Sequence, residues 1–266
     1  MENSKTKIAI IGYGEIGSSL AKVYQEKNIV PMIRDLNVNT IHGSIDVLNI
    51  CLPYNKEFVN TVNDYIDEYL PKLTIIHTTV SVGATKKISR PVVHSPIRGV
   101  HPNLTEGIKT FTKFIGYNNL TDLVLCKEHY DELEIDYYPV KNTDASELAK
   151  LMSTTYYGLC IAWHGEMKKM CDEYDVDFEI INDWTLQYNK GYYQLGMQNV
   201  VRPNLYPPKD GIGGHCIIPN TEILNKEFTS KALDLILEYK KDKDIKKYPK
   251  GSLLNELPPS DYQMGN

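Results

Sequence analysis

An apolar segment near the amino terminus runs directly into a turn that contains three glycines. Residues 7–11 have the composition of a buried strand, and a helical pattern of apolar residues follows the turn. A strand, a Gly-x-Gly-x-x-Gly turn and a helix in this order are typical of sites where backbone amides and a helix N-terminus meet a pyrophosphate. The alternative is a tight turn that binds nothing. We expect this turn to bind a dinucleotide cofactor through Gly12, Tyr13, Gly14, Glu15, Ile16 and Gly17.

An acidic residue ends the second expected strand, which covers residues 30–34. Asp35 follows the glycine turn at roughly the 20-residue interval at which dinucleotide-binding folds place an acid on the ribose hydroxyls. A carboxylate there repels the 2′-phosphate of NADP, so the sequence favours NAD as the cofactor. The neighbouring Arg34 keeps NADP as the alternative, because a guanidinium pairs well with a phosphate.

The first 141 residues alternate short apolar strands with helical segments. Further strands are expected at 46–52, 74–77, 91–94, 111–116 and 137–140, and helices at 58–70 and 126–133. This alternation predicts an α/β fold with a Rossmann-type, doubly wound parallel sheet. Ligands of such sheets lie beyond the carboxyl ends of the strands, so we expect Pro53, Thr79 and Ser95 to face one crevice.

The hydrophobic period changes after residue 141, where we place the end of the first domain. Apolar residues then recur at helical spacing along a 143–170 helix, with Thr143 or Asp144 as the N-cap candidate. A helix of this length usually forms a wall shared between domains or subunits, and its aromatic residues lie on more than one face. The sequence therefore predicts a homodimer centred on this helix.

The remaining part of the chain is expected to complete a smaller all-helical domain. This domain covers residues 142–240 and ends with one helix at 221–239. The charged, Pro- and Gly-containing residues 241–266 are expected to form a partly disordered tail.

Composition narrows the classes of function. The 266 residues, 42% of them hydrophobic, can bury a sizeable core, and a net charge of −5 argues against a nucleic-acid surface. Five scattered cysteines are expected to be free thiols in a reducing compartment. The sequence shows no signal peptide and no apolar run near the ~20 residues that span a bilayer. We expect a cytoplasmic protein with a small-molecule substrate and neither a membrane nor a nucleic-acid partner.

A second glycine-rich segment, residues 211–220, surrounds one cysteine. Glycines give such a loop backbone freedom and clearance for close approach. By themselves the residues leave two interpretations of Cys216, a buried inert thiol and an activated nucleophile. A zinc site is a third alternative, although no pair of its candidate ligands has the usual spacing, and no metal is expected. Those candidates are His94, His101, His164, His215 and Cys216.

The segment resembles the Gly-x-Gly-Gly-His-Cys-x-Pro motif around the catalytic cysteine of the UDP-glucose/GDP-mannose dehydrogenase family, most closely its UDP-N-acetylmannosamine dehydrogenase branch. The resemblance implies that Cys216 is a nucleophile and that a primary alcohol of a sugar or nucleotide sugar is oxidised through a thiohemiacetal and a thioester. Residues 77–85 are similar to the family's Ser-Thr-Val-Pro-x-Gly-Thr, which implies that Thr79 helps to hold an active-site water and lies near the cofactor. A looser likeness implies that Leu52 and Pro53 lie at the cofactor.

The segment Glu147-Leu148-Ala149-Lys150 resembles the family's Glu-Leu-x-Lys, whose lysine reaches the sugar oxygen. An ammonium there would stabilise the alkoxide that develops as hydride leaves. Without the resemblance, a solvated helix lysine is the favoured interpretation of Lys150. The family's asparagine one helical turn later is Thr154 here, whose hydroxyl can still donate and accept a hydrogen bond.

Two departures from the family pattern concern proton transfer. The family's aspartate four residues after the cysteine is Asn220, and an amide cannot accept a proton at neutral pH. The family's Pro-Glu-x-x-x-Glu has lost both carboxylates, to Ile97 and His101. We expect His101 to supply the base, because imidazole titrates near neutrality. The hydrolytic half of the reaction should then be the slower half.

The family continues into a third domain that holds the nucleotide, and this sequence stops before it. The resemblance therefore implies a truncated relative that corresponds to the first two domains. The alternative function is an NAD-binding, catalytically reduced relative that acts as a regulatory, scaffolding or split-enzyme subunit.

Overall fold

One mixed sheet organises the amino-terminal part of the protein. The structure is a computed structural model that describes residues 6–214 and 216–241. The eight strands lie in the order β3-β2-β1-β4-β5-β6-β7-β8. Their bounds are β1 (Ile8–Ile11), β2 (Met32–Asp35), β3 (Val38–Asn39), β4 (Val47–Ile50), β5 (Leu73–Ile76), β6 (Val92–His94), β7 (Lys113–Tyr117) and β8 (Tyr137–Lys141).

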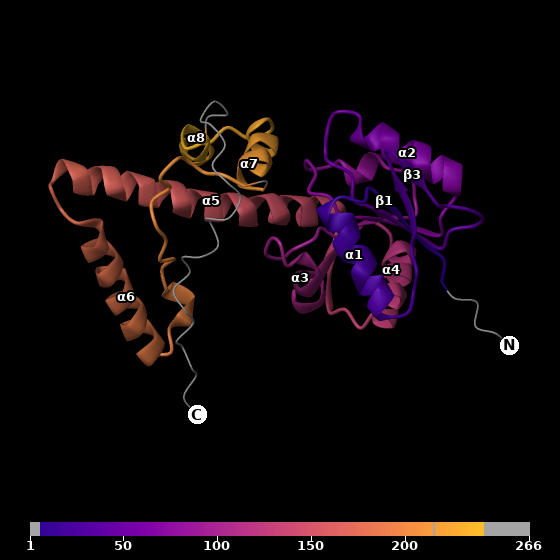
Figure 1. The fold of residues 1–266 in the computed structure, drawn as a ribbon, viewed down its shortest axis with the longest axis horizontal. Coiled ribbons are helices and arrows are strands. Elements are labelled where there is room, and N and C mark those ends of the chain that lie inside the picture. The colour runs from indigo at the N-terminus through magenta and orange to yellow at the C-terminus, as the bar shows by residue number, and fades with distance from the viewer. Residues whose placement is uncertain (1–5, 215, 242–266) are drawn as a thin grey trace.

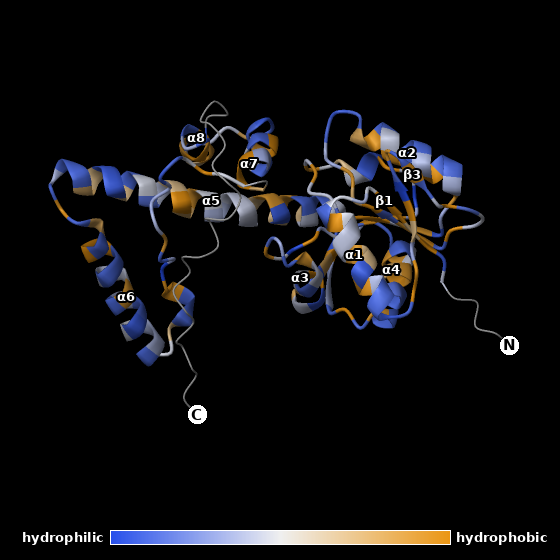
Figure 2. Ribbon diagram, in the orientation of Figure 1, coloured by the Kyte–Doolittle hydropathy of each residue, from blue (hydrophilic) through white to orange (hydrophobic). Residues whose placement is uncertain are grey.

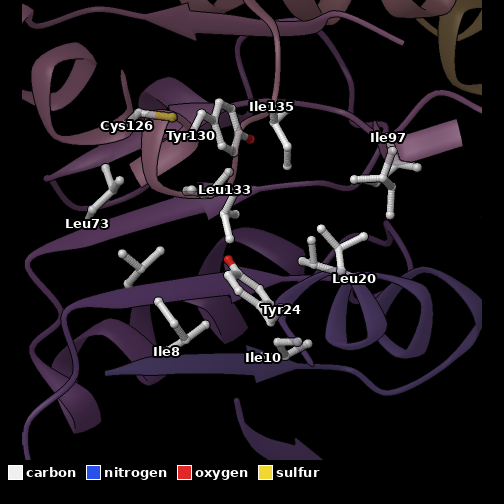
Figure 3. Close-up of a cluster of buried hydrophobic side chains, with 14 of the residues drawn as sticks. Ile8, Ile10, Leu20, Tyr24, Leu73, Ile97, Cys126, Tyr130, Leu133 and Ile135 are labelled. Carbon is white, nitrogen blue, oxygen red and sulfur yellow. The ribbon is translucent and has the colours of Figure 1, made fainter. Parts of the chain in front are cut away.

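Helices cover both faces of the sheet (Figure 1). They are α1 (Glu15–Glu26), α2 (Phe58–Tyr69), α3 (Leu104–Thr110), α4 (Leu120–Glu132) and the short 3₁₀ helix η1 (Thr85–Lys87). Because successive side chains of a strand point to opposite faces, β1 contributes to two separate cores. Ile8 and Ile10 pack with α1 and α4, whereas Ala9 and Ile11 pack with α2. Figure 3 shows the first of these cores, with Tyr24 of α1 beside the strands.

The predicted α/β, Rossmann-type fold is confirmed, with one correction to the sheet. Strands β2, β1, β4, β5 and β6 are parallel to one another, but β3 runs antiparallel to β2 and β7 runs antiparallel to β6. The central strands β1, β4 and β5 are buried at every position and mostly apolar, as expected of strands that are covered on both faces, and Figure 2 shows them as largely hydrophobic. The sequence missed β3 and α3, since neither has the length or the periodicity that identifies an element.

A long helix, α5 (Thr143–Glu173), leads out of the sheet directly after β8. In Figure 1 it forms a rod away from the sheet, and α6 (Phe178–Gln194) turns back from its far end. The expected N-cap is wrong: Asn142, not Thr143 or Asp144, caps the helix, because its side chain accepts a hydrogen bond from the amide of Ala145.

The carboxy-terminal part packs on α5. The short 3₁₀ helix η2 (Gln198–Val200) follows α6, and the expected single helix at 221–239 is in fact two, α7 (Ile217–Asn225) and α8 (Lys231–Glu238). Both contribute apolar residues to a third core with α5. The boundary at residue 141 stays a proposal, and the tail beyond residue 241 lies outside the described residues. Within residues 6–214 and 216–241, no helix combines the length and apolarity needed to cross a bilayer.

Candidate active site

The glycine turn after β1 is built so tightly that two of its glycines have no room for a side chain. Gly12 has a φ of +92°, and a Cβ there would lie 2.8 Å from the carbonyl oxygen of Cys51. A Cβ on Gly17 would lie 1.9 Å from the carbonyl oxygen of Gly12. Around Gly14, by contrast, the space is open. Since the first amides of α1 lack partners within the helix, the turn fits the pyrophosphate of a dinucleotide.

Asp35 lies at the edge of this turn. Its carboxylate accepts hydrogen bonds from the amides of Tyr13 and Leu36, and these two amides hold the pKa of Asp35 below its usual range. A carboxylate that is ionised at neutral pH beside the glycine turn is suited to ribose hydroxyls. Arg34 lies on the opposite face of β2, near Tyr69 of α2, as the alternation of a strand requires.

Three side chains from separate segments meet at the start of α7. Cys216 is the N-cap residue of α7 and is exposed, so the interpretation as a buried thiol is wrong. Its Sγ lies 3.6 Å from Nε2 of His101, which belongs to the loop between β6 and α3. Nδ1 of His101 lies 2.5 Å from Oε1 of Glu15, the first residue of α1. The arrangement joins a thiol, an imidazole and a carboxylate in the order found in nucleophilic catalysis.

Lys150 lies beside the thiol and is not a solvated helix lysine. Its Nζ donates a hydrogen bond of 2.9 Å to the carbonyl of Ile97. Burial lowers the pKa of Lys150, an effect that its charge interaction with Cys216 partly offsets. Arg98 is a second cation close to Lys150.

The chain is related in sequence to known dehydrogenases. The UDP-N-acetyl-D-mannosamine dehydrogenase of Methanococcus vannielii is 27% identical over 206 residues, which cover 69% of this chain and 45% of that protein. The Methanocaldococcus jannaschii protein of the same name is 26% identical over 219 residues, covering 72% and 48%. The chain resembles UDP-N-acetyl-D-mannosamine dehydrogenases. The resemblance inferred from the cysteine segment is thus confirmed, although the chain spans about half the length of these relatives. No protein-family model matches it.

A solved dehydrogenase structure supports the fold. The UDP-D-ManNAc dehydrogenase from Pyrococcus horikoshii superposes with a TM-score of 0.71 at 17% identity, covering 88% of this chain and 69% of that one. At this identity the likeness concerns the Rossmann-type sheet and the helical part that follows it.

The other residues that the dehydrogenase motifs single out make fewer contacts at the site. The hydroxyl of Thr154 donates to the carbonyl of Lys150, within its own helix. Asn220 is only 6% exposed and lies one turn beyond Cys216, whose carbonyl its backbone amide reaches at 3.0 Å. Thr79 is half-buried after β5. These three roles stay predictions.

The expected crevice at the strand ends needs a correction. Ser95 is fully buried, and its Oγ accepts a hydrogen bond of 2.9 Å from the hydroxyl of Tyr130, so it faces the interior. Pro53 is exposed and Leu52 is half-buried after β4, where the carbonyl of Leu52 accepts a hydrogen bond from Thr78. Leu52 and Pro53 therefore remain candidates for the cofactor site, whereas Ser95 does not.

Of the candidate zinc ligands, His101 and Cys216 lie 3.6 Å apart, but His94 and His164 have other partners. His94 is buried and forms a hydrogen bond with Ser146 of α5. His164 forms a hydrogen bond with the carbonyl of Cys160 and accepts one from the backbone amide of Leu205. Among the residues that the structure describes, no three His, Cys, Asp or Glu side chains are grouped for a metal. His215 lies outside those residues.

Two buried charged residues that support the site were not predicted from the sequence. Lys113 is only 3% exposed, its Nζ donates to the carbonyls of Ser95 and Pro96 at 2.6 and 3.1 Å, and burial lowers its pKa to about 7. The carboxylate of Glu147 accepts hydrogen bonds of 2.6 and 2.8 Å from the backbone amides of Gly83 and Thr85. Only the family motif singles out Glu147, and nothing in the sequence distinguishes Lys113 from a surface lysine.

Proposed function

We propose that the chain is an NAD-dependent oxidoreductase that oxidises a primary alcohol of a sugar or nucleotide sugar through Cys216. The observation that carries the proposal is the 3.6 Å approach of His101 Nε2 to the thiol, beside the cation of Lys150. The resemblance to named nucleotide-sugar dehydrogenases supports the same chemistry. The proposed location is cytoplasmic.

The chain's own groups divide the work as follows. Bound NAD⁺ would supply the hydride acceptor, held at the turn 12–17 and by Asp35. Lys150 would place its ammonium against the carbinol oxygen and stabilise the alkoxide that develops as the hydroxyl proton leaves to water and the hydride leaves to the cofactor. His101 would take the thiol proton as the sulfur adds to the aldehyde carbon and would return it to the aldehyde oxygen, which gives a thiohemiacetal on Cys216. Loss of a second hydride to NAD⁺ and of the hydroxyl proton to water would give a thioester, which water hydrolyses to the carboxylate.

The proposal is tested by steady-state NADH formation with a panel of nucleotide sugars and the corresponding free sugars. We expect NADH with at least one of them and a carboxylate product. If the chain binds NAD but produces no NADH, alone or with any protein that copurifies, the alternative of a regulatory, scaffolding or split-enzyme subunit replaces it.

The cofactor preference is a separate expectation. Because Asp35 lies at the turn and Arg34 lies on the other face of β2, NAD(H) should bind at least tenfold more tightly than NADP(H), a difference of about 1.4 kcal/mol. Titration calorimetry with both cofactors measures it. Equal affinities would overturn the role given to Asp35.

We also propose a homodimer centred on α5. Its side chains Tyr156, Tyr157 and Trp163 are 64%, 50% and 51% exposed, more aromatic surface than a helix usually leaves to solvent. Light scattering at micromolar protein should give twice the mass of the chain, and the variant Trp163→Glu should lower it. A monomeric mass for the wild type contradicts the proposal.

A further inference from the structure

We propose that Glu15 is a positioning residue that holds His101 as the base for Cys216, an inference that rests on the proposed function of Cys216 as a nucleophile. The 2.5 Å contact between Glu15 Oε1 and His101 Nδ1 and the 3.6 Å contact between His101 Nε2 and Cys216 Sγ form one continuous chain. A carboxylate at Nδ1 keeps the proton on that nitrogen, so the lone pair of Nε2 faces the sulfur. Loss of the carboxylate would free the ring to adopt the opposite tautomer.

The position of Glu15 makes this role specific. It is the first residue of α1, where the helix dipole stabilises a negative charge. The same place lies in the glycine turn, however, where a carboxylate would repel a pyrophosphate. Its hydrogen bond with His101 Nδ1 instead directs the carboxylate toward the imidazole.

The segment 95–98, which leads to His101, is held by charged side chains. Buried Lys113 donates hydrogen bonds of 2.6 and 3.1 Å to the carbonyls of Ser95 and Pro96. Lys150 donates a hydrogen bond of 2.9 Å to the carbonyl of Ile97. The guanidinium of Arg98 lies 4.7 Å over an aromatic ring of β7. A loop anchored at successive residues presents the imidazole in a defined place, which a proton transfer requires.

His101 accounts for two of the proton transfers of the proposed reaction. In the first, the thiol proton moves to Nε2, the electron pair left on sulfur forms the bond to the aldehyde carbon, and the imidazolium gives the proton to the aldehyde oxygen, so that a thiohemiacetal and a neutral imidazole result. Loss of a second hydride to NAD⁺ and of the hydroxyl proton to water then gives the thioester. In the hydrolysis, Nε2 takes a proton from water while the water oxygen attacks the thioester carbon. The carbon–sulfur bond then breaks, its electron pair goes to sulfur, and the imidazolium returns a proton to Cys216. His101 thus replaces the two carboxylates that the family pattern places here.

A model in which Glu15 acts only through its charge and a model in which it positions His101 predict opposite changes in the pKa of Cys216 when Glu15 is removed. A nearby negative charge disfavours a thiolate, so simple removal of that charge should lower the pKa of Cys216. If Glu15 instead stabilises the imidazolium that pairs with the thiolate, its removal should raise the pKa. The charge of Lys150 on α5, which interacts with the thiol, and that of Arg98, which lies near Lys150, are the same in both cases.

The test is the pH dependence of Cys216 alkylation by iodoacetamide, followed by peptide mass spectrometry in the absence of NAD and sugar. We expect Glu15→Gln to move the midpoint up by about one pH unit, which corresponds to about a tenfold slower reaction at neutral pH. The control Glu26→Gln removes the same charge from the far end of α1, where Glu26 pairs with Lys109, and should leave the profile unchanged.

A second arm separates positioning from a direct effect. In the His101→Asn background, Glu15→Gln should have no further effect on the profile, and Glu15→Asp in the wild type should restore part of the reactivity. An unchanged or lowered midpoint in Glu15→Gln overturns the proposal, as does an undiminished effect of Glu15→Gln when His101 is absent. Because no substrate is used, these outcomes are independent of whether the nucleotide-sugar panel gives NADH.

Discussion

Replacement of Cys216 by alanine should lower acid formation by ~10⁴-fold or more, because the covalent intermediate can no longer form. The wild type, incubated with NAD and the sugar that yields NADH, should carry an acyl adduct that intact-protein mass spectrometry detects. The adduct should be absent from Cys216→Ser. The control Cys160→Ala removes a different, partly buried thiol on α5 and should keep the adduct.

The amount of acyl adduct also measures how well His101 replaces the two carboxylates of the family pattern as a base. Loss of a general base typically costs ~10²- to 10⁴-fold, and His101 is the base that remains near the thiol. We therefore expect a slow turnover in which an aldehyde or an acyl species on Cys216 accumulates. If Cys216→Ala reduces NAD and forms acid as fast as the wild type, the nucleophile assignment is wrong.

Substitution of Gly17 by alanine should have the largest effect on the cofactor half of the molecule. The added Cβ would lie 1.9 Å from a backbone oxygen of Gly12, so the strand and α1 must move apart. Overpacking of this kind costs roughly 1–3 kcal/mol or more, and the distorted turn should no longer bind NAD. Urea unfolding and calorimetry measure the two effects.

Gly14→Ala provides the matched control in the same turn. Gly14 has a φ of −68°, and no atom lies within 4 Å of an added Cβ. The stability of the Gly14→Ala variant should therefore match that of the wild type. If a pyrophosphate approaches the turn closely, however, this variant should bind NAD more weakly. Equal loss of stability in both variants would contradict the packing argument, and full NAD affinity in Gly14→Ala would contradict the proposed cofactor position.

Local patterns in the sequence were enough to predict most strands of the sheet and the long helix α5. Residues 8–11 form a short continuous apolar run, because a strand that packs on both faces needs apolar side chains at successive positions. The long helix followed from its 3.6-residue period over many turns. The glycine turn was recognisable because its tight backbone permits no other residue at two positions. Each of these properties depends on residues close together in the chain.

Only the tertiary structure decided which residues meet at the thiol. Glu15 and His101 are 86 residues apart, and His101 and Cys216 are 115 apart, so no spacing predicts their contact. The sequence assigned Glu15 to the cofactor, whereas the fold directs its carboxylate to the imidazole. Lys113 likewise resembles any surface lysine until β7 places it under the 95–98 segment. The physical reason is that a side chain's partner depends on how the strands and helices pack, which the local pattern of the chain does not contain.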